Sequence, residues 1–224
     1  MKPLRLHDWD LDRAAAQDVQ KALAPLVSQR SEIPDTPRLI AGVDISGTLA
    51  DGQALGAVVL LQYPGMEIVE VQTVRRKPLM PYIPGLLSFR EIPVLLEAFE
   101  CLEAAPDLIL CDGHGFAHPR RFGLACHLGI LLGVPSIGCA KSVLVGKYEM
   151  PALEAGATAT LVDRGEPVGM ALRTQYGKMP VFVSVGHKVD IASAVRWVQA
   201  CVRRFRLPEP ARLAHLAASG RVLR

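Results

Sequence analysis

The chain has 224 residues, half of them hydrophobic and 5% aromatic, and its formal net charge is +3. This length supports one sizeable domain with its own core, and we expect residues 1–224 to form a single domain. The mild charge permits a nucleic-acid partner without arguing for one, because clustered charges matter more than the total. No apolar run approaches membrane-spanning length, and the N-terminal segment shows no apolar signal sequence. We therefore expect a cytoplasmic protein with no membrane partner.

Cysteine usage points to the same compartment. The chain has five cysteines, an odd number, and no pair is spaced Cys-X-X-Cys. All five lie among apolar neighbours, which indicates reduced core residues of a cytosolic protein rather than a disulfide framework. These residues are Cys101, Cys111, Cys126, Cys139 and Cys201.

The first third of the chain predicts one helix and three strands. Hydrophobic residues at helical spacing predict a helix over 7–29, and either Asp10 or Asp12 could cap its start. After a proline-containing linker, apolar and alternating segments predict strands over 39–46, 54–63 and 68–74. The turns between these strands are short, so we expect them to form an antiparallel meander.

The segment over 77–93 is rich in proline, which excludes a regular helix across it. Ser88, near its end, is expected to cap a helix that runs to about residue 104. Glu91 would then lie in the first turn of this helix, where Pro93 is still tolerable.

A buried strand over 108–111 follows and ends abruptly at Asp112, where glycines allow a sharp turn. The pair His118-Pro119 opens a predicted helix, because proline suits the first helical position, and Gly133 ends it. The remaining predicted elements are strands over 136–139, 167–173 and 180–185, a helix over 191–205, and a basic tail containing Pro208-Glu209-Pro210.

Three antiparallel strands followed by helix, strand, helix and strand predict a mixed α/β fold. In this topology the first and fourth strands can lie side by side at the centre of the sheet. Asp44 on the first strand and Asp112 after the fourth would then lie within reach of one ion. Taken alone, Asp112 has a simpler interpretation as a cap at a strand-to-helix turn.

Three carboxylates are therefore expected to converge at one edge of the sheet. Asp44, Glu91 and Asp112 come from a strand, a helix start and a strand end, and their oxygens would hold one or two Mg²⁺ ions. Such sites hydrolyse phosphodiester bonds by generating hydroxide and by stabilising the leaving oxygen. Lys141, at the end of the next strand, could neutralise a phosphate oxygen or orient water. Its alternative is a solvated lysine at a helix start.

Several motifs resemble those of the endonuclease V family, and they follow one another along nearly the whole chain. The most specific is Pro-Tyr-Ile-Pro-Gly-Leu-Leu-Ser-Phe-Arg-Glu over 81–91. The others are Ala41-Gly42-Val43-Asp44, Asp112-Gly113-His114-Gly115 with Ala117-His118-Pro119-Arg120, Ile137-Gly138-Cys139-Ala140-Lys141, Val185-Gly186-His187 and Arg206-Leu207-Pro208-Glu209-Pro210. The resemblance implies a ribonuclease H-like fold, with a central mixed sheet flanked by helices.

The resemblance also implies a Mg²⁺-dependent DNA repair endonuclease, in which Mn²⁺ can substitute. Its implied substrate is DNA that contains deoxyinosine, the product of adenine deamination, or another deaminated or distorted base. The implied reaction cuts the second phosphodiester bond on the 3′ side of the lesion and leaves 3′-hydroxyl and 5′-phosphate ends. We expect the protein to act as a monomer.

Two other functions stay open. The first is a ribonuclease H-like nuclease that acts on inosine in RNA, because nothing in the acids distinguishes DNA from RNA. The second is a lesion-binding module without catalytic activity, in which the acids are structural. Retention of all three acids and of Lys141 argues against the second.

The matching motifs imply roles for individual residues. Asp44, Glu91 and Asp112 resemble the family's metal-binding acids, and Lys141 resembles its active-site lysine. His118 resembles the family's histidine near the scissile phosphate.

Tyr82 resembles the wedge residue that fills the gap left by a displaced base. A rigid proline frame around an aromatic ring suits insertion between bases, whereas the alternative is an ordinary buried tyrosine in a proline turn. The implied base pocket consists of Gly85, Leu87, Gly113 and Leu144. Glycines there would expose backbone amides, although each could simply serve a tight turn.

Three short basic clusters are candidates for phosphate contacts that would make binding salt-dependent. They are Arg75-Arg76-Lys77, Arg120-Arg121 and Arg203-Arg204-Arg206, and the alternative for each is a solvated face. Pro119-Arg120-Arg121 is the best candidate, because a helix start would add its amides and partial positive charge. We assign Arg90 and Arg120 to DNA binding together with Tyr82.

Overall fold

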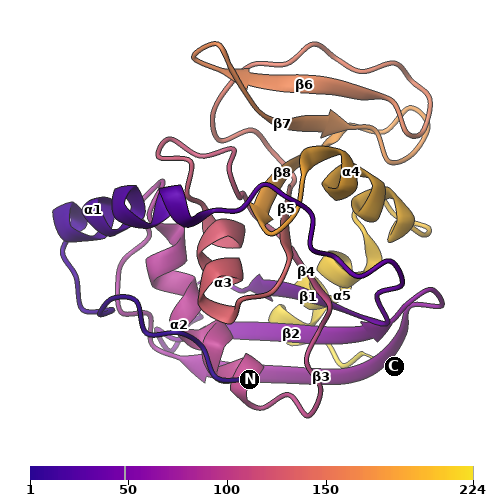
Figure 1. Cartoon of the computed structure of the whole chain (residues 1–224). Coiled ribbons are helices and arrows are strands. Elements are labelled where there is room, and N and C mark those ends of the chain that lie inside the picture. The colour runs from indigo at the N-terminus through magenta and orange to yellow at the C-terminus, as the bar shows by residue number, and fades with distance from the viewer. Residues whose placement is uncertain (48, 224) are drawn as a thin grey trace.

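Eight strands form one mixed sheet in the computed structural model, which describes residues 1–47 and 49–223 (Figure 1). The strands lie in the order β3-β2-β1-β4-β5-β8-β7-β6. Their bounds are β1 Leu39–Ile45, β2 Ala54–Gln62, β3 Glu67–Arg76, β4 Leu108–Cys111, β5 Ser136–Ala140, β6 Thr158–Asp163, β7 Glu166–Leu172 and β8 Val181–His187. β1, β2 and β3 pair antiparallel, whereas β1, β4 and β5 pair parallel. The predicted meander and the mixed sheet are confirmed.

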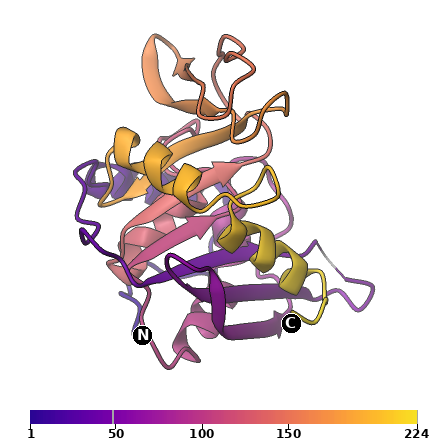
Figure 2. The same ribbon diagram turned by 90° about the vertical axis from the view of Figure 1, so that its right-hand side faces the viewer.

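Helices cover both faces of this sheet, and Figure 2 shows α4 and α5 together on one of them. The helices are α1 Arg13–Leu23, a 3₁₀ turn η1 Ala24–Leu26, α2 Leu87–Glu100, α3 Leu124–Leu132, α4 Ile191–Ala200 and α5 Glu209–Ala218. Ile40 and Leu108 belong to a core shared with α4 and α5, whereas their neighbours Ala41 and Ile109 face α2 and α3. This alternation is the strand period of two. None of the helices in the described chain combines the length and apolar character needed to cross a membrane.

Parallel pairing of β1 with β4 brings two of the predicted acids together. Val43 pairs with Cys111, and the backbone N–H of Asp112 donates to the carbonyl of Val43 at 3.1 Å. Asp44 and Asp112 each follow this pair directly, so they lie at the same carboxyl edge of the sheet. The adjacency predicted from the element order is confirmed.

α1 is shorter than the helix predicted over 7–29. It begins at Arg13 because Asp12 is the N-cap, and the Asp12 carboxylate accepts a hydrogen bond from the N–H of Ala15 at 2.8 Å. It gives way to η1 after Leu23, where Pro25 lacks the N–H that an α-helix needs. The residues before Asp12 are not helical. They run past α3, where Leu4 donates its N–H to the carbonyl of Leu131 at 2.7 Å.

α2 begins two residues earlier than predicted. Its N-cap is Leu86, which makes no side-chain capping bond, so the prediction that Ser88 caps this helix is wrong. Ser88 is buried inside the helix, with its hydroxyl 3.2 Å from Nδ1 of His127. The first turn of α2 contains no acid, so Glu91 lies in the second turn, and Pro93 lies inside the helix.

α3 begins later than predicted, at Leu124 instead of His118. Residues 118–121 form a turn in which Arg121 adopts a positive φ of 55° and donates its N–H to the carbonyl of His118 at 2.9 Å. Pro119-Arg120-Arg121 therefore does not lie at a helix start, and the expected helix-terminus contribution to phosphate binding is absent there. Gly133 ends the helix with φ of 69°, as predicted.

Two elements of the C-terminal region, β6 and α5, were not predicted from the sequence. The predicted helix over 191–205 ends at Ala200, and the predicted basic tail is helix α5. Among the described strands, β6 pairs with β7 alone and lies at the edge of the sheet, as Figure 1 shows. Of the five cysteines, Cys101 is exposed, so the prediction of a buried core position is wrong for it alone.

A close backbone contact positions α5 on the sheet. A Cβ atom on Gly42 of β1 would lie 1.9 Å from the carbonyl oxygen of Pro210, a separation that real side chains do not reach. Glycine therefore lets the first turn of α5 pack directly on β1. The rest of α5 then runs along the sheet, with Leu213, Ala214 and Ala217 buried against it.

Candidate active site

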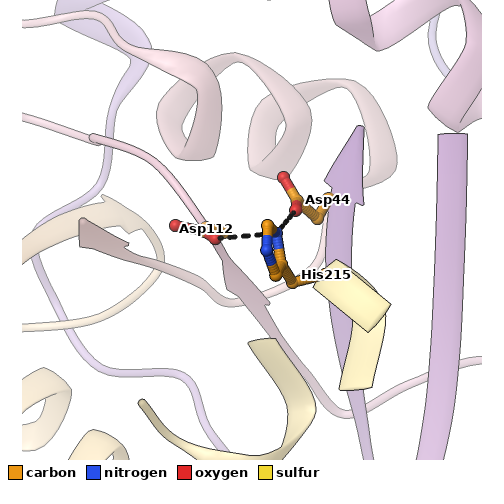
Figure 3. A group of neighbouring side chains, drawn as sticks. All are labelled: Asp44, Asp112 and His215. Atoms are coloured by element: carbon orange, nitrogen blue, oxygen red, sulfur yellow. Dashed lines mark hydrogen bonds and ion pairs between the residues drawn. The ribbon is translucent and has the colours of Figure 1, made fainter. Parts of the chain in front are cut away.

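Asp44, Asp112 and His215 converge at the carboxyl edge of the sheet (Figure 3). Asp44 comes from β1, Asp112 follows β4, and His215 projects from the last turn of α5. One ligand atom from each lies within 4.8 Å of the others. Nδ1 of His215 is 2.7 Å from Oδ2 of Asp44 and 4.0 Å from Oδ2 of Asp112.

The two aspartates are largely buried, whereas His215 is half exposed. Side-chain exposure is 15% for Asp44, 9% for Asp112 and 49% for His215. Burial raises the pKa of Asp44, the charge of Asp112 raises it further, and the hydrogen bond with His215 opposes both. Two carboxylates facing each other in a poorly solvated place repel unless a cation lies between them. The carboxylate oxygens fit Mg²⁺ or Mn²⁺, whereas the imidazole is a ligand more typical of transition metals.

Glu91 belongs to the same electrostatic environment. Burial raises its pKa to about 8, the charges of Asp44 and Asp112 contribute in the same direction, and Arg90 opposes them. Glu91 nevertheless lies outside the group of ligand atoms that are mutually within 4.8 Å. Asp44 and Asp112 are therefore close neighbours, whereas Glu91 interacts with them electrostatically over a longer distance.

Lys141 lies beside Asp112, as its place after β5 predicts. Its Nζ atom is 2.5 Å from Oδ2 of Asp112, and 38% of its side chain is exposed. Because of this ion pair, Lys141 is not simply a solvated lysine, which was the alternative interpretation. One edge of the site thus carries an ammonium group that partly balances the acids.

His215 is the residue that the sequence analysis missed. Its helix was interpreted as a basic tail, although helix signals are present in the sequence. Glu209 and Pro210 lie in the first turn, where an acid and a proline are favoured, and small apolar residues recur at helical spacing. Recognising this helix would have put His215 on a buried element instead of a solvated tail.

A cavity of about 300 Å³ adjoins the acids. Asp112 and Lys141 line it. All four residues predicted for the base pocket line it as well, namely Gly85, Leu87, Gly113 and Leu144. Tyr82, the predicted wedge residue, lies at the same cavity. Tyr82 is 68% exposed, so the interpretation of an ordinary buried tyrosine is wrong. An exposed aromatic ring beside a pocket of this size is suited to contact with a base.

His118 lines the same cavity but is held on both sides. Its Nε2 is 3.0 Å from the carbonyl oxygen of Gly85, and its Nδ1 accepts from the N–H of Arg120 at 3.2 Å. Because Nε2 faces an acceptor, it must carry the ring proton. Burial, followed by the charge of Arg120, lowers the pKa of His118 to about 4. At neutral pH this imidazole is uncharged and orients the loop around Gly85.

The predicted DNA-binding arginines are largely engaged within the chain. Arg90 is 8% exposed and acts electrostatically on Glu91. The Nη2 atom of Arg120 donates to the carbonyl of Gly85 at 2.7 Å, and its Nε donates to Gln20 at 2.5 Å. Arg121 pairs with Asp163 and Glu166. In the remaining clusters Arg76 pairs with Glu97 and Arg203 donates to backbone carbonyls, whereas Arg75, Lys77 and Arg204 are exposed.

Comparison with known proteins agrees with this architecture. The family model described as endonuclease V matches residues 21–216 of the chain. Endonuclease V from Roseiflexus sp. is 54% identical over 218 residues, which cover 96% of this chain and 96% of that protein.

Solved structures agree as well. Endonuclease V from Streptomyces avermitilis superposes with a TM-score of 0.89 and 40% identity, over 95% of this chain and 93% of that one. Endonuclease V from Ciona intestinalis matches with a TM-score of 0.79 and 27% identity, over 92% of this chain and 96% of that one. The Ciona protein was crystallised with a 24mer DNA containing an inosine followed by a ribo-adenosine. The fold is ribonuclease H-like, as the resemblance implied.

Proposed function

The chain belongs to the endonuclease V family, and from this premise we propose that it is a Mg²⁺-dependent DNA repair endonuclease that recognises deoxyinosine. Family membership already makes it a nuclease that hydrolyses phosphodiester bonds. The observation that carries the finer proposal is the largely buried pair of Asp44 and Asp112, which shares one edge with His215 and Lys141. We propose further that residues 1–224 act as one domain in the cytoplasm, which agrees with the single sheet and the free thiols.

Asp44, Asp112 and His215 would hold the metal, with Glu91 as a further ligand. When bound, Mg²⁺ lowers the pKa of water and stabilises the charge that develops on phosphate oxygens. The Lys141 ammonium group pairs with the Oδ2 atom of Asp112 that also lies near His215, and there it would neutralise the phosphate as the bond breaks. A bound cation would favour the charged form of Asp44, whose pKa burial raises, and of Glu91.

The cavity suits a base that has left its stack. Extrusion of a base costs less when its pairing is weak, as with inosine. Gly85, Leu87, Gly113 and Leu144 would surround the extruded base, while Tyr82 fills the gap in the duplex. Hydrolysis of the second phosphodiester bond on the 3′ side, which leaves 3′-hydroxyl and 5′-phosphate ends, is the product pattern we propose. Asp112 and Lys141 line this same cavity, which supports cleavage close to the extruded base.

His118 and the arginines would support this arrangement. His118 would keep the Gly85 loop and the Arg120 backbone in place beside the reacting phosphate. Arg90 would act on Glu91, and Arg120 would present the part of its guanidinium group that faces away from Gly85 to the strand.

A second candidate is cleavage of inosine in RNA. The Ciona relative was crystallised with a strand in which a ribonucleotide follows the inosine, which favours keeping this candidate. A lesion-binding module without activity accounts for neither the ion pair of Lys141 with Asp112 nor the clustered acids.

Cleavage of end-labelled strands tests both candidates. Matched DNA and RNA duplexes, each with inosine or adenine at one position, are incubated with the protein in Mg²⁺, in Mn²⁺ or in EDTA. We expect metal-dependent cleavage of inosine DNA, two bonds to the 3′ side, and none in EDTA. Faster cleavage of the RNA duplex would favour the second candidate, and binding without cleavage in either metal would favour the lesion-binding module.

A further inference from the structure

Gln20 of α1 carries a buried amide that is fully used. It is 1% exposed, and its Nε2 donates to two carbonyls, those of Gly85 and Phe122, each at 3.1 Å. Its Oε1 accepts from Nε of Arg120 at 2.5 Å. Two acceptors on one side and a donor on the other fix which end of the amide is nitrogen.

Packing does not require an amide at this position. A buried amide costs free energy unless all its hydrogen bonds are made, and an apolar side chain of the same length would fill the space. The three bonds of Gln20 therefore identify what the amide does. It ties α1 to the loop before α2 and to the turn before α3.

The loop needs such an anchor at Gly85. Prolines restrict the backbone before it, whereas Gly85 adopts a positive φ of 78° and could otherwise pivot freely. The Gly85 carbonyl accepts from three side chains, those of Gln20, His118 and Arg120. Only Gln20 approaches from α1, an element outside the catalytic motifs. All three donors together fix the peptide plane that follows Gly85.

The geometry points to Gln20 as a positioning residue for base discrimination, an inference that rests on the proposed function. Gln20, Gly85 and Leu87 line one cavity, and Tyr82 lies on the same loop. When Gln20 holds the Gly85 carbonyl, the loop presents a pocket of one shape before any base enters. Loss of one of the three donors to the Gly85 carbonyl loosens the loop, so the pocket distinguishes inosine from adenine less well.

Two substitutions remove the anchor in different ways. Gln20→Glu keeps the length and the acceptor for Arg120 but loses both donors, so that a carboxylate faces two carbonyls. Gln20→Met keeps the length and loses all three bonds. The matched control is Gln17→Glu, which makes the same change of charge on the same helix, at a position whose side chain takes no part in the Gly85 network.

The first measurement needs no substrate. Backbone amide exchange over 82–87 should become faster in both Gln20 variants and stay unchanged in the Gln17 variant. The second measurement is the ratio of kcat/KM for inosine duplex to that for adenine duplex. We expect this ratio to fall by about tenfold, the loss typical of a buried hydrogen bond, and Mg²⁺-induced thermal stabilisation to stay as in wild type.

Three results would overturn the inference: unchanged amide exchange, an unchanged ratio in both Gln20 variants, or an equal loss of activity and thermal stability with all substrates. Failure of the proposed function itself is separately visible, because the wild-type protein would then not cleave the inosine duplex. In that case the exchange measurement still decides whether Gln20 holds the loop.

Discussion

Nδ1 of His215 lies 2.7 Å from Oδ2 of Asp44, although 171 positions separate the two residues in the chain. The contact joins the last turn of α5 to the end of β1. His215 lowers the pKa of Asp44 against the effect of burial, so it keeps that carboxylate available for a cation.

His215→Ala should therefore weaken metal binding more than it disturbs the fold. The expected result is a Mg²⁺ dependence of cleavage shifted to higher concentration, with activity partly recovered at saturating Mg²⁺. Titration of single-turnover rates with Mg²⁺ measures the shift. An unchanged Mg²⁺ dependence, with a lower plateau only, would show that His215 acts on the reaction and not on the metal.

Replacement of the acids should separate activity from stability. Asp44→Ala, Glu91→Ala and Asp112→Ala are each expected to abolish Mg²⁺-dependent cleavage. In EDTA, Asp44→Asn should unfold at a temperature no lower than wild type, because it removes one of two buried charges that repel each other. Thermal melts and cleavage assays on the same preparations check both. Near-normal cleavage by the Asp44 or Asp112 variant would rule out the assigned metal site.

Lys141→Ala should slow the chemical step more than it weakens binding. Charge develops on the phosphate in the transition state, where an ammonium group contributes most. A decrease of about a hundredfold in the single-turnover rate at saturating enzyme is expected, with a small change in affinity for the inosine duplex. Equal single-turnover rates for variant and wild type would refute this role.

Glu91 predicts a pH dependence of stability in the metal-free protein. Its pKa is raised from 4.5 to about 8 on folding, so the folded state binds more protons than the unfolded state between these values. Its contribution to stability is fully present below about pH 4.5 and is lost as pH rises to about 8, by up to about 1.4 kcal/mol per pH unit.

The measurement compares thermal melts of wild type and Glu91→Gln in EDTA. Between about pH 5 and 8, the wild type should lose stability relative to the variant, and the difference should level off above. Taking the difference removes contributions from histidines such as His118, which titrate in both proteins. Parallel curves would show that the Glu91 carboxyl is not buried beside the other acids.

Tyr82→Ala tests the wedge assignment. Loss of the ring should weaken binding of inosine duplex by about 1–3 kcal/mol, one stacking contribution. Cleavage of inosine in single-stranded DNA should suffer less, because that base needs no unpairing. The ratio of duplex to single-strand cleavage and the melting temperature are measured together. A lower melting temperature with an unchanged ratio would show that Tyr82 stabilises the fold and does not act as a wedge.

The sequence predicted the acids well because their positions depend on strand order. An apolar run over 108–111 with no polar interruption requires burial on both faces, and short turns forced β1, β2 and β3 into a meander. These two facts were enough to place Asp44 beside Asp112. The start of α2 was less predictable, because Leu86 caps it without any side-chain bond and Ser88 offers a more familiar signal.

The missed parts depend on contacts between distant segments. His118-Pro119 has the residues of a helix start, yet Arg121 takes a positive φ where it pairs with Asp163 and Glu166, and no local pattern reveals that pairing. His215 was missed for a related reason. α5 is held against β1 through the close approach of Pro210 to Gly42, and a glycine in a strand does not by itself say what packs on it.

The distance in sequence between Asp44 and His215 has a consequence for synthesis of the protein. Asp44, Glu91 and Asp112 leave the ribosome long before α5 does. His215 joins these acids only when that helix packs on β1. A growing chain therefore carries the acids and the cavity loop without the fourth member of the site. On the proposed function, the site reaches its full affinity for the metal only once the last helix has folded onto the first strand.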